Sequence, residues 1–177
     1  YTLKTKGLSN TNLIDNGDFE SGFTGFSTAY TKSSPGGPFG PDNIDVGPNP
    51  QAYNGGFAPC GDHGGGGNQL IVDGSTSAGK NVWCQSVTTV SGRMYQLTFY
   101  VQSVYPVSPP NLNARVNGNS VGSVNAGGIC EWVEFTTCFT ATSGSSSICI
   151  TEQSGVGFGN DFAIDDKIWL VGYLKGL

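Results

Sequence analysis

Charged residues are scarce in this chain of 177 residues, at 12% of the total, and basic ones are the scarcer: 8 Lys and Arg stand against 13 Asp and Glu. The resulting net charge of −5 removes the phosphate neutralisation on which nucleic-acid binding depends. No apolar run approaches the roughly 20 residues that a membrane-spanning helix requires. We therefore expect neither nucleic-acid binding nor membrane insertion.

Long stretches of Ala, Leu, Glu and Lys are also missing, which argues against helices. Gly alone accounts for 28 residues, and Gly, Ser, Asn and Thr are typical of short strands joined by turns. The segment 94–104 alternates strictly, with Tyr95, Leu97, Phe99 and Val101 on one face. Further strands are predicted at 12–14, 69–73, 81–90, 112–116, 121–124, 132–141, 147–151 and 162–173, with no element between 32 and 67. This pattern predicts an all-β protein, a two-sheet β-sandwich of jelly-roll type.

The two ends of the chain differ from the rest. We predict an N-terminal extension strand at 1–11, a jelly-roll domain at 12–166 and an apolar C-terminal strand or tail at 167–177. The tail sequence IWLVGYLKGL is apolar on both faces, so a free end would aggregate unless something covered it. Strand exchange between copies of this chain would cover it. One hypothesis is therefore a structural or adhesive module of a filament or surface assembly, and a monomer that tucks both ends onto its own sheet is the alternative.

Five cysteines are present, none in a CxxC pair, and the one histidine cannot complete a zinc-finger spacing. Disulfides in an oxidising compartment account for them better, which predicts a secreted protein at the extracellular cell surface. Cys60 could pin the structureless segment before it. Strand alternation points both Cys138 and Cys149 outward, and the turn at Ser143 would join their two strands in a hairpin. We therefore predict a Cys138–Cys149 disulfide.

Acidic residues gather in two motifs near the ends of the domain, NLIDNGDFESG from Asn12 and GNDFAIDD from Gly159. A sandwich that pairs its first and last strands would bring these carboxylates together. Calcium takes six to eight oxygen ligands, many of them backbone carbonyls, so a structural calcium ion is one reading. The alternative is that Asp18, Glu20 and Asp165 are ordinary turn and surface acids.

These two motifs, together with GNQLIVDGS and NVWCQSVTTVSGRMYQLTFYV, resemble the jelly-roll modules of secreted and surface proteins of the Bacteroidetes. Those modules are related to family 4/9-type carbohydrate-binding modules and, more loosely, to galactose-binding-like domains. The resemblance implies carbohydrate binding and a structural calcium ion held by Glu20 and Asp165, with Asp18 or Asp166 as further ligands. Lys167, which follows the closing acids, departs from the family pattern.

Aromatic side chains are the candidate ligand contacts, because a pyranose ring can stack on an aromatic face. We select Tyr53, Tyr100 and Tyr105 for this role and assign Trp83 to the core. No catalytic residue is assigned: His63 lies in a Gly-rich loop without a nucleophile motif, where capping a turn is the simpler role. We therefore expect a non-catalytic module, with glycan binding as the alternative to the structural role.

Overall fold

The computed structural model describes residues 11–172, without the side chains of residues 166–169. The elements are β1 (Thr31–Lys32), β2 (Asn43–Gly47), the 3-10 turn η1 (Pro50–Ala52), β3 (Gln69–Val72), β4 (Lys80–Thr88), β5 (Met94–Ser103), β6 (Asn111–Val116), β7 (Asn119–Asn125), β8 (Val133–Thr140), β9 (Ser145–Glu152) and β10 (Phe162–Gly172). No helix in this part of the chain is long and apolar enough to cross a membrane.

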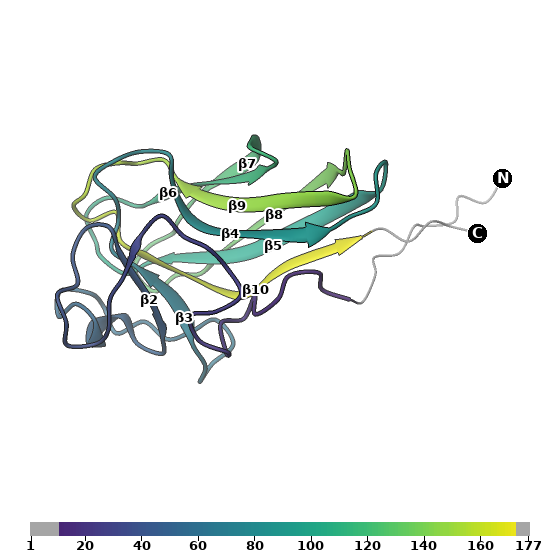
Figure 1. Ribbon diagram of the computed structural model, residues 1–177. Coiled ribbons are helices and arrows are strands. Elements are labelled where there is room, and N and C mark those ends of the chain that lie inside the picture. Colours follow the sequence, from purple (N-terminus) through teal and green to yellow (C-terminus); the bar gives the residue numbers. More distant parts are fainter. Residues whose placement is uncertain (1–10, 173–177) are drawn as a thin grey trace.

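The strands form two sheets that pack face to face. One sheet has the order β1-β2-β3-β10-β5-β8, and the other has the order β4-β9-β6-β7. Figure 1 shows the four-stranded sheet above β10, β3 and β2 of the six-stranded sheet. The protein is an all-β, two-sheet sandwich of jelly-roll type, as predicted.

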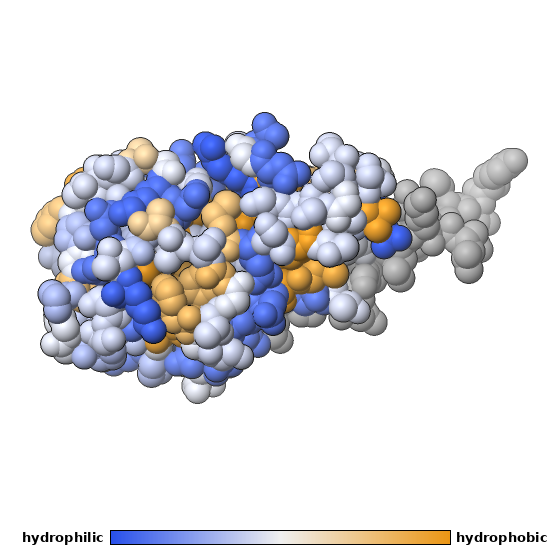
Figure 2. Space-filling view, viewed as in Figure 1, coloured by the Kyte–Doolittle hydropathy of each residue, from blue (hydrophilic) through white to orange (hydrophobic). Residues whose placement is uncertain are grey.

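The core lies between the sheets and follows the alternation of the strands. Tyr95, Leu97, Phe99 and Val101 of β5 are all buried, and Trp83 of β4 is fully buried among them. The face of the molecule in Figure 2 carries apolar patches near its middle, separated by a strip of polar side chains. Inward-facing apolar residues thus hold the two sheets together, which confirms both core predictions.

Two segments differ from the prediction. Residues 12–14 form no strand, although Ile14 is buried. The stretch 32–67, in which no element was predicted, contains β2 and η1. Its Tyr53 and Phe57 join Ile71, Val104 and Ala163 in a second apolar cluster on the outer face of the six-stranded sheet. The few apolar residues of this segment lie among many Pro, Gly and Asn residues, and β2 is too short for its alternation to be detected.

The predicted Cys138–Cys149 disulfide is wrong. Cys149 is bonded to Cys84, its direct neighbour across β4 and β9, and Cys138 is an exposed thiol on β8. Both Cys138 and Cys149 point outward, as their strand positions predicted. However, β8 and β9 belong to different sheets, so the two side chains leave opposite faces of the sandwich. The turn between them connects the sheets and does not close a hairpin.

Strand β10 runs across the domain boundary predicted at residue 167. After an irregularity between Asp165 and Trp169 it pairs with β5 as far as Gly172, opposite Tyr95. Leu170 and Val171 are buried, and the backbone N–H of Leu13 donates to the carbonyl of Leu170 at 2.9 Å. The first part of the apolar tail is therefore covered by its own sheet. Residues 1–10 of the extension strand predicted at 1–11, and the end of the tail at 173–177, lie outside the described residues.

Candidate functional site

Two carboxylates meet where β3 ends and β10 begins. Phe162 pairs with Val72 in the antiparallel ladder of these strands, so Asp73 and Asp161, one step beyond, face each other. Both side chains are buried, and their carboxyl groups are hydrogen-bonded to each other. The backbone N–H of Gly74 donates to Asp161 Oδ1 at 2.9 Å. The strand register therefore creates a close acid pair at one end of the sandwich.

A cavity of about 300 Å³ opens beside this acid pair. We call it the loop-end pocket, because its walls come from the loops at the left-hand end of the sandwich in Figure 1. Its lining consists of Gly40, Pro41, Asn54, Gly56, Phe57, Asp73, Tyr105, Gly157, Phe158, Gly159 and Asp161. Cavities of this size are at the lower end of those that hold small-molecule ligands.

Two aromatic rings form one side of the loop-end pocket. Phe158 is 63% exposed and packs edge-on against Tyr105, with ring centroids 5.6 Å apart. Gly159 lets the two loops approach this closely: its φ is +78°, and a Cβ there would lie 2.6 Å from Cβ of Val107. A large exposed aromatic beside a pocket is unusual for a side chain with only a packing role.

The loop-end pocket also has polar lining residues. The amide nitrogen of Asn54 donates to Asp73 Oδ2 at 3.2 Å, while its Oδ1 accepts from the N–H of Gly56 at 3.0 Å. The pocket lining thus combines an amide and two carboxyl groups with aromatic rings. This combination suits a ligand that has both an apolar face and hydroxyl groups.

Burial and mutual repulsion change the acidity of the pair. Burial, followed by the charge of Asp161, raises the pKa of Asp73 to about 7. Burial also raises the pKa of Asp161, although hydrogen bonds from Gly74 and Asp73 oppose the change. Two carboxylates in contact within a low-dielectric site cannot both ionise readily, so the pair shares one proton near neutral pH.

Glu152, at the end of β9, organises the structure behind the acid pair. This fully buried carboxylate accepts hydrogen bonds from the hydroxyl of Tyr30, the amide of Asn160 and the backbone N–H of Ser75, the last at 2.8 Å. Burial and then the charge of Glu152 raise the pKa of Tyr30 above its ordinary value. The loop before β10 is therefore held to β9 and to the segment after β3.

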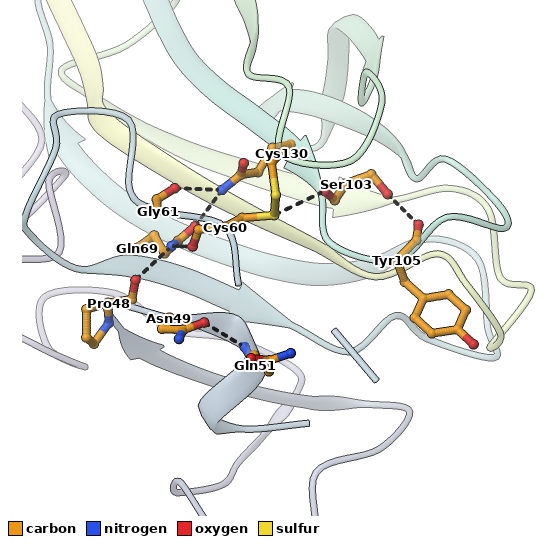
Figure 3. Close-up of a disulfide and its surroundings, with 10 residues drawn as sticks. Pro48, Asn49, Gln51, Cys60, Gly61, Gln69, Ser103, Tyr105 and Cys130 are labelled. Carbon is orange, nitrogen blue, oxygen red and sulfur yellow. Dashed lines mark hydrogen bonds between the residues drawn. A yellow bond between two sulfur atoms is a disulfide. The ribbon is translucent and has the colours of Figure 1, made fainter. Parts of the chain in front are cut away.

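The disulfide between Cys60 and Cys130 fixes two further loops near the loop-end pocket, as Figure 3 shows. Beside it, the Gln69 amide donates to the carbonyl of Cys60 at 2.9 Å, and the Gln102 amide donates to Gln69 at 2.8 Å. The Tyr105 ring points away from the disulfide. Cys60 does pin the long segment before β3.

A second cavity, of about 270 Å³, contains the acids predicted to bind calcium. We call it the acidic pocket; its lining is Asp18, Glu20, Asp62, Gly64, Gly65, Gly67 and Asp165. Backbone N–H groups already bind some of the carboxylates: Asn68 donates to Glu20 at 2.7 Å and His63 to Asp165 at 2.8 Å. The structure therefore brings Asp18, Glu20 and Asp165 to one place.

The glycine loop 64–67 shapes the acidic pocket. A Cβ at Gly67 would lie 2.2 Å from a Glu20 oxygen, so a side chain at this position would displace the Glu20 carboxylate. Although burial opposes it, N–H groups of Gly66, Gly67 and Gly65 hold the pKa of Asp62 below its ordinary value. Asp62, which the sequence interpretation did not select, is thus a fourth carboxylate of the pocket.

The donors of the acidic pocket are all oxygen atoms, which fits a hard cation such as calcium in chemical type. Within residues 11–172, however, no three His, Cys, Asp or Glu side chains are grouped as metal ligands would be. A calcium ion would therefore need backbone carbonyls for much of its coordination. Glu20, Asp165 and Asp18 would be the side chains that hold it.

The three tyrosines selected from the sequence lie in different environments. Tyr105 lines the loop-end pocket. Tyr100 is half-buried and stacks on His63, with ring centroids 3.9 Å apart, beside Trp132. Tyr53 is buried and donates its hydroxyl to the carbonyl of Val46 at 2.9 Å, and burial followed by the charge of Asp45 raises its pKa to about 12. Tyr53 is therefore a packing residue and does not line either pocket.

Of the residues that line the loop-end pocket, the sequence singled out Tyr105 alone; the polar and exposed aromatic side chains that it missed are Asn54, Asp73, Phe158 and Asp161. Phe158 carried the only usable signal, as a lone aromatic in the Gly-rich run GVGFG. The acids were visible but belong to loops whose meeting depends on the pairing of β3 with β10.

No protein-family model and no curated protein sequence matches this chain. Solved structures do match. The carbohydrate-binding module TmCBM61, solved in complex with β-1,4-galactotriose, is 18% identical with a TM-score of 0.60, over 91% of this chain and 98% of that one. The CBM22-1 xylan-binding domain of Xyn10C from Paenibacillus barcinonensis is 15% identical with a TM-score of 0.57, over 99% and 100% of the two chains.

The chain has the jelly-roll fold of carbohydrate-binding modules. The same fold also occurs in the Stig cyclase Fisc from Fischerella sp. TAU, which is 13% identical with a TM-score of 0.63 over 93% of this chain and 98% of that one. At these identities the likeness concerns the fold alone, and the fold serves both binding proteins and enzymes. The relation to family 4/9-type modules stays a prediction.

Proposed function

We propose that this protein is a secreted, non-catalytic glycan-binding module and that its ligand occupies the loop-end pocket. The observation that carries the proposal is the exposed Phe158 packed against Tyr105 in a pocket that Asn54 and the acid pair also line. The C–H groups of one sugar face would lie on the aromatic rings, and the hydroxyl groups would bond to the amide and carboxyl oxygens.

Two further observations support a glycan ligand outside the cell. The jelly-roll neighbours include a module solved with β-1,4-galactotriose and a xylan-binding domain. The two disulfides indicate an oxidising compartment, where extracellular glycans are found.

The test is a glycan array followed by calorimetric titration with the best ligands, including β-1,4-galactotriose and xylan oligosaccharides. We expect Phe158→Ala to weaken binding at least about tenfold, because aromatic anchors dominate such contacts. Val156→Ala is the matched control, since Val156 is 57% exposed on the same loop but does not line the pocket. A Phe158→Ala protein that binds every glycan as the parent does would remove the loop-end pocket as the site.

The acidic pocket is proposed to have a separate, structural role. A calcium ion held by Glu20, Asp165 and Asp18 would tie the N-terminal segment to β10 and to the glycine loop. The four carboxylates around one cavity support this role, because a cation would offset their mutual repulsion.

The alternative function, a filament or adhesive subunit joined by terminal strands, has less support. Its main motive was an uncovered apolar tail, and residues 169–172 instead pair with β5. What remains of the hypothesis concerns residues 1–10 and 173–177, which lie outside the described residues. We therefore rank glycan binding first and self-association second.

A further inference from the structure

The wall of the loop-end pocket that carries Phe158 is attached to the sandwich next to the acid pair. Asp161 is the last residue of this loop before β10, and its partner Asp73 is the first residue after β3. Besides the carboxyl–carboxyl hydrogen bond, the N–H of Gly157 donates to the carbonyl of Ser75 at 3.1 Å, and the N–H of Ser108 donates to Gly159 at 3.0 Å. The loop has further anchors, because the amide of Asn160 donates to the carbonyl of Ser75 at 3.1 Å and to Glu152, and the N–H of Val104 donates to the carbonyl of Asp161 at 3.0 Å. Among these anchoring side chains, Asp73 and Asp161 are the ones that line the loop-end pocket.

We propose that the proton shared by Asp73 and Asp161 acts as a latch: the pocket is closed and binds its ligand while the pair holds the proton, and ionisation of both acids loosens the wall and weakens binding. This inference rests on the proposed glycan-binding function and adds its regulation by pH. Loss of the proton replaces a hydrogen bond with two adjacent negative charges, which repel each other strongly at a buried site.

The charges around the pair favour keeping the proton. Asp42, from the segment before β2, raises the pKa of Asp73, and Glu152, at the end of β9, raises that of Asp161. The neighbouring cation Lys80 of β4 is engaged by Asp42, with Nζ 2.7 Å from its carboxylate. Among the remaining facing groups, Asn54 carries no charge and Tyr105 contributes its ring and hydroxyl. Burial followed by the charge of Glu152 raises the pKa of Tyr30 above its ordinary value, so its hydroxyl stays neutral. Within the described lining of the loop-end pocket, no side chain is a cation that could replace the proton.

The direction of the pH effect follows from linkage. If the closed form requires one proton, the affinity for ligand is constant below the pKa of the pair and falls by up to about tenfold per pH unit above it. Since the pKa of Asp73 is about 7, the fall begins near neutral pH. An extracellular module would then bind most tightly in neutral to acidic surroundings and release ligand in alkaline ones.

Asp73→Asn is the informative variant, because a carboxamide can donate to Asp161 permanently while its oxygen still accepts from Asn54. Asp45→Asn is the matched control: Asp45 is a buried acid of β2 whose pKa is also raised by burial, but it does not line the pocket. Two measurements are made between pH 5 and pH 9 on all three proteins. One is hydrogen exchange at the amides of Gly157 and Gly159, corrected for intrinsic rates, and the other is calorimetric titration with β-1,4-galactotriose and xylan oligosaccharides.

We expect the parent and Asp45→Asn proteins to lose protection at these glycines, and affinity for glycan, as pH rises through 7. Asp73→Asn should keep both across the range. Protection in the parent protein that does not change with pH would overturn the latch, even if Asp73→Asn failed to fold. Glycan binding that is equally tight at pH 5 and pH 9 would also overturn it and would leave the proposed function standing. A pH-dependent wall in a protein that binds no glycan at any pH would support the latch and count against the proposed function.

Discussion

Cys84 and Cys149 face each other across neighbouring strands of the four-stranded sheet, and their disulfide joins β4 to β9. The other disulfide, Cys60–Cys130, joins two loops at the outer face of the six-stranded sheet, near the loop-end pocket. The two bonds close chain segments of nearly equal length, with separations of 65 and 70 residues. Their effects on stability should therefore be similar, while their effects on ligand binding should differ.

Replacing Cys60 and Cys130 by Ser should lower the free energy of unfolding by about 2–4 kcal/mol and should weaken glycan binding. Replacing Cys84 and Cys149 by Ser should cost a similar free energy but leave affinity for glycan unchanged in the folded protein. Denaturant unfolding and calorimetric titration of both variants provide the comparison. Equal losses of affinity would show that the Cys60–Cys130 bond has no special role at the pocket.

Peptide mapping without reduction should recover Cys60 linked to Cys130 and Cys84 linked to Cys149. A maleimide should label the native protein at Cys138, because this thiol is exposed on β8. Recovery of a Cys138–Cys149 peptide would contradict the assignment of β8 and β9 to different sheets.

Removal of calcium should lower the melting temperature of the protein if the acidic pocket holds this ion. Glu20→Gln should remove the response to chelator, because Glu20 is one of the carboxylates that would bind the metal. Glu134→Gln, at an exposed acid of β8 outside the pocket, is the control and should respond as the parent does. A parent protein whose melting temperature does not change when chelator is added would contradict the proposed calcium site.

Deleting residues 168–177 should unfold the protein. The deletion removes the half of β10 that pairs with residues 95–98 of β5, together with the buried Leu170 and Val171. Burial of two such side chains stabilises a fold by roughly 1.5–3 kcal/mol each, a large part of a typical domain's stability. A chain that ends at Gly172 keeps these contacts and is the control. A folded product of the longer deletion, by circular dichroism, would revive the tail as an intermolecular strand.

The stability of the protein should fall as pH rises from about 4 to about 7 because of Asp73. A carboxyl group whose pKa is higher in the folded state binds its proton more tightly there, so its contribution is present at low pH and lost as pH passes the folded value. After allowance for solvent screening, Asp73→Asn should be more stable than the parent at pH 8 by about 2 kcal/mol. Urea unfolding at pH 5 and pH 8 measures the difference, which should be less than half as large at the lower pH.

The sequence by itself determined the fold class and most of the strands. Alternation in β5 identified the buried side chains correctly, because the strand period of two is a local property of the backbone. Tyr105, selected as an aromatic ligand candidate, does line the loop-end pocket. Glu20, Asp18 and Asp165, selected from the two acidic motifs and the family resemblance, do line one cavity.

Only the tertiary structure decided which strands share a sheet, and therefore which outward-facing side chains are neighbours. The alternation of side chains along each strand placed Cys138 and Cys149 outward, but it could not show that β8 and β9 lie in opposite sheets. The same limit hid the loop-end pocket, because Asp73 and Asp161 are 88 positions apart and meet only through the register of β3 with β10. Strand order and register depend on contacts between segments distant in sequence, and these are absent from any local pattern of residues.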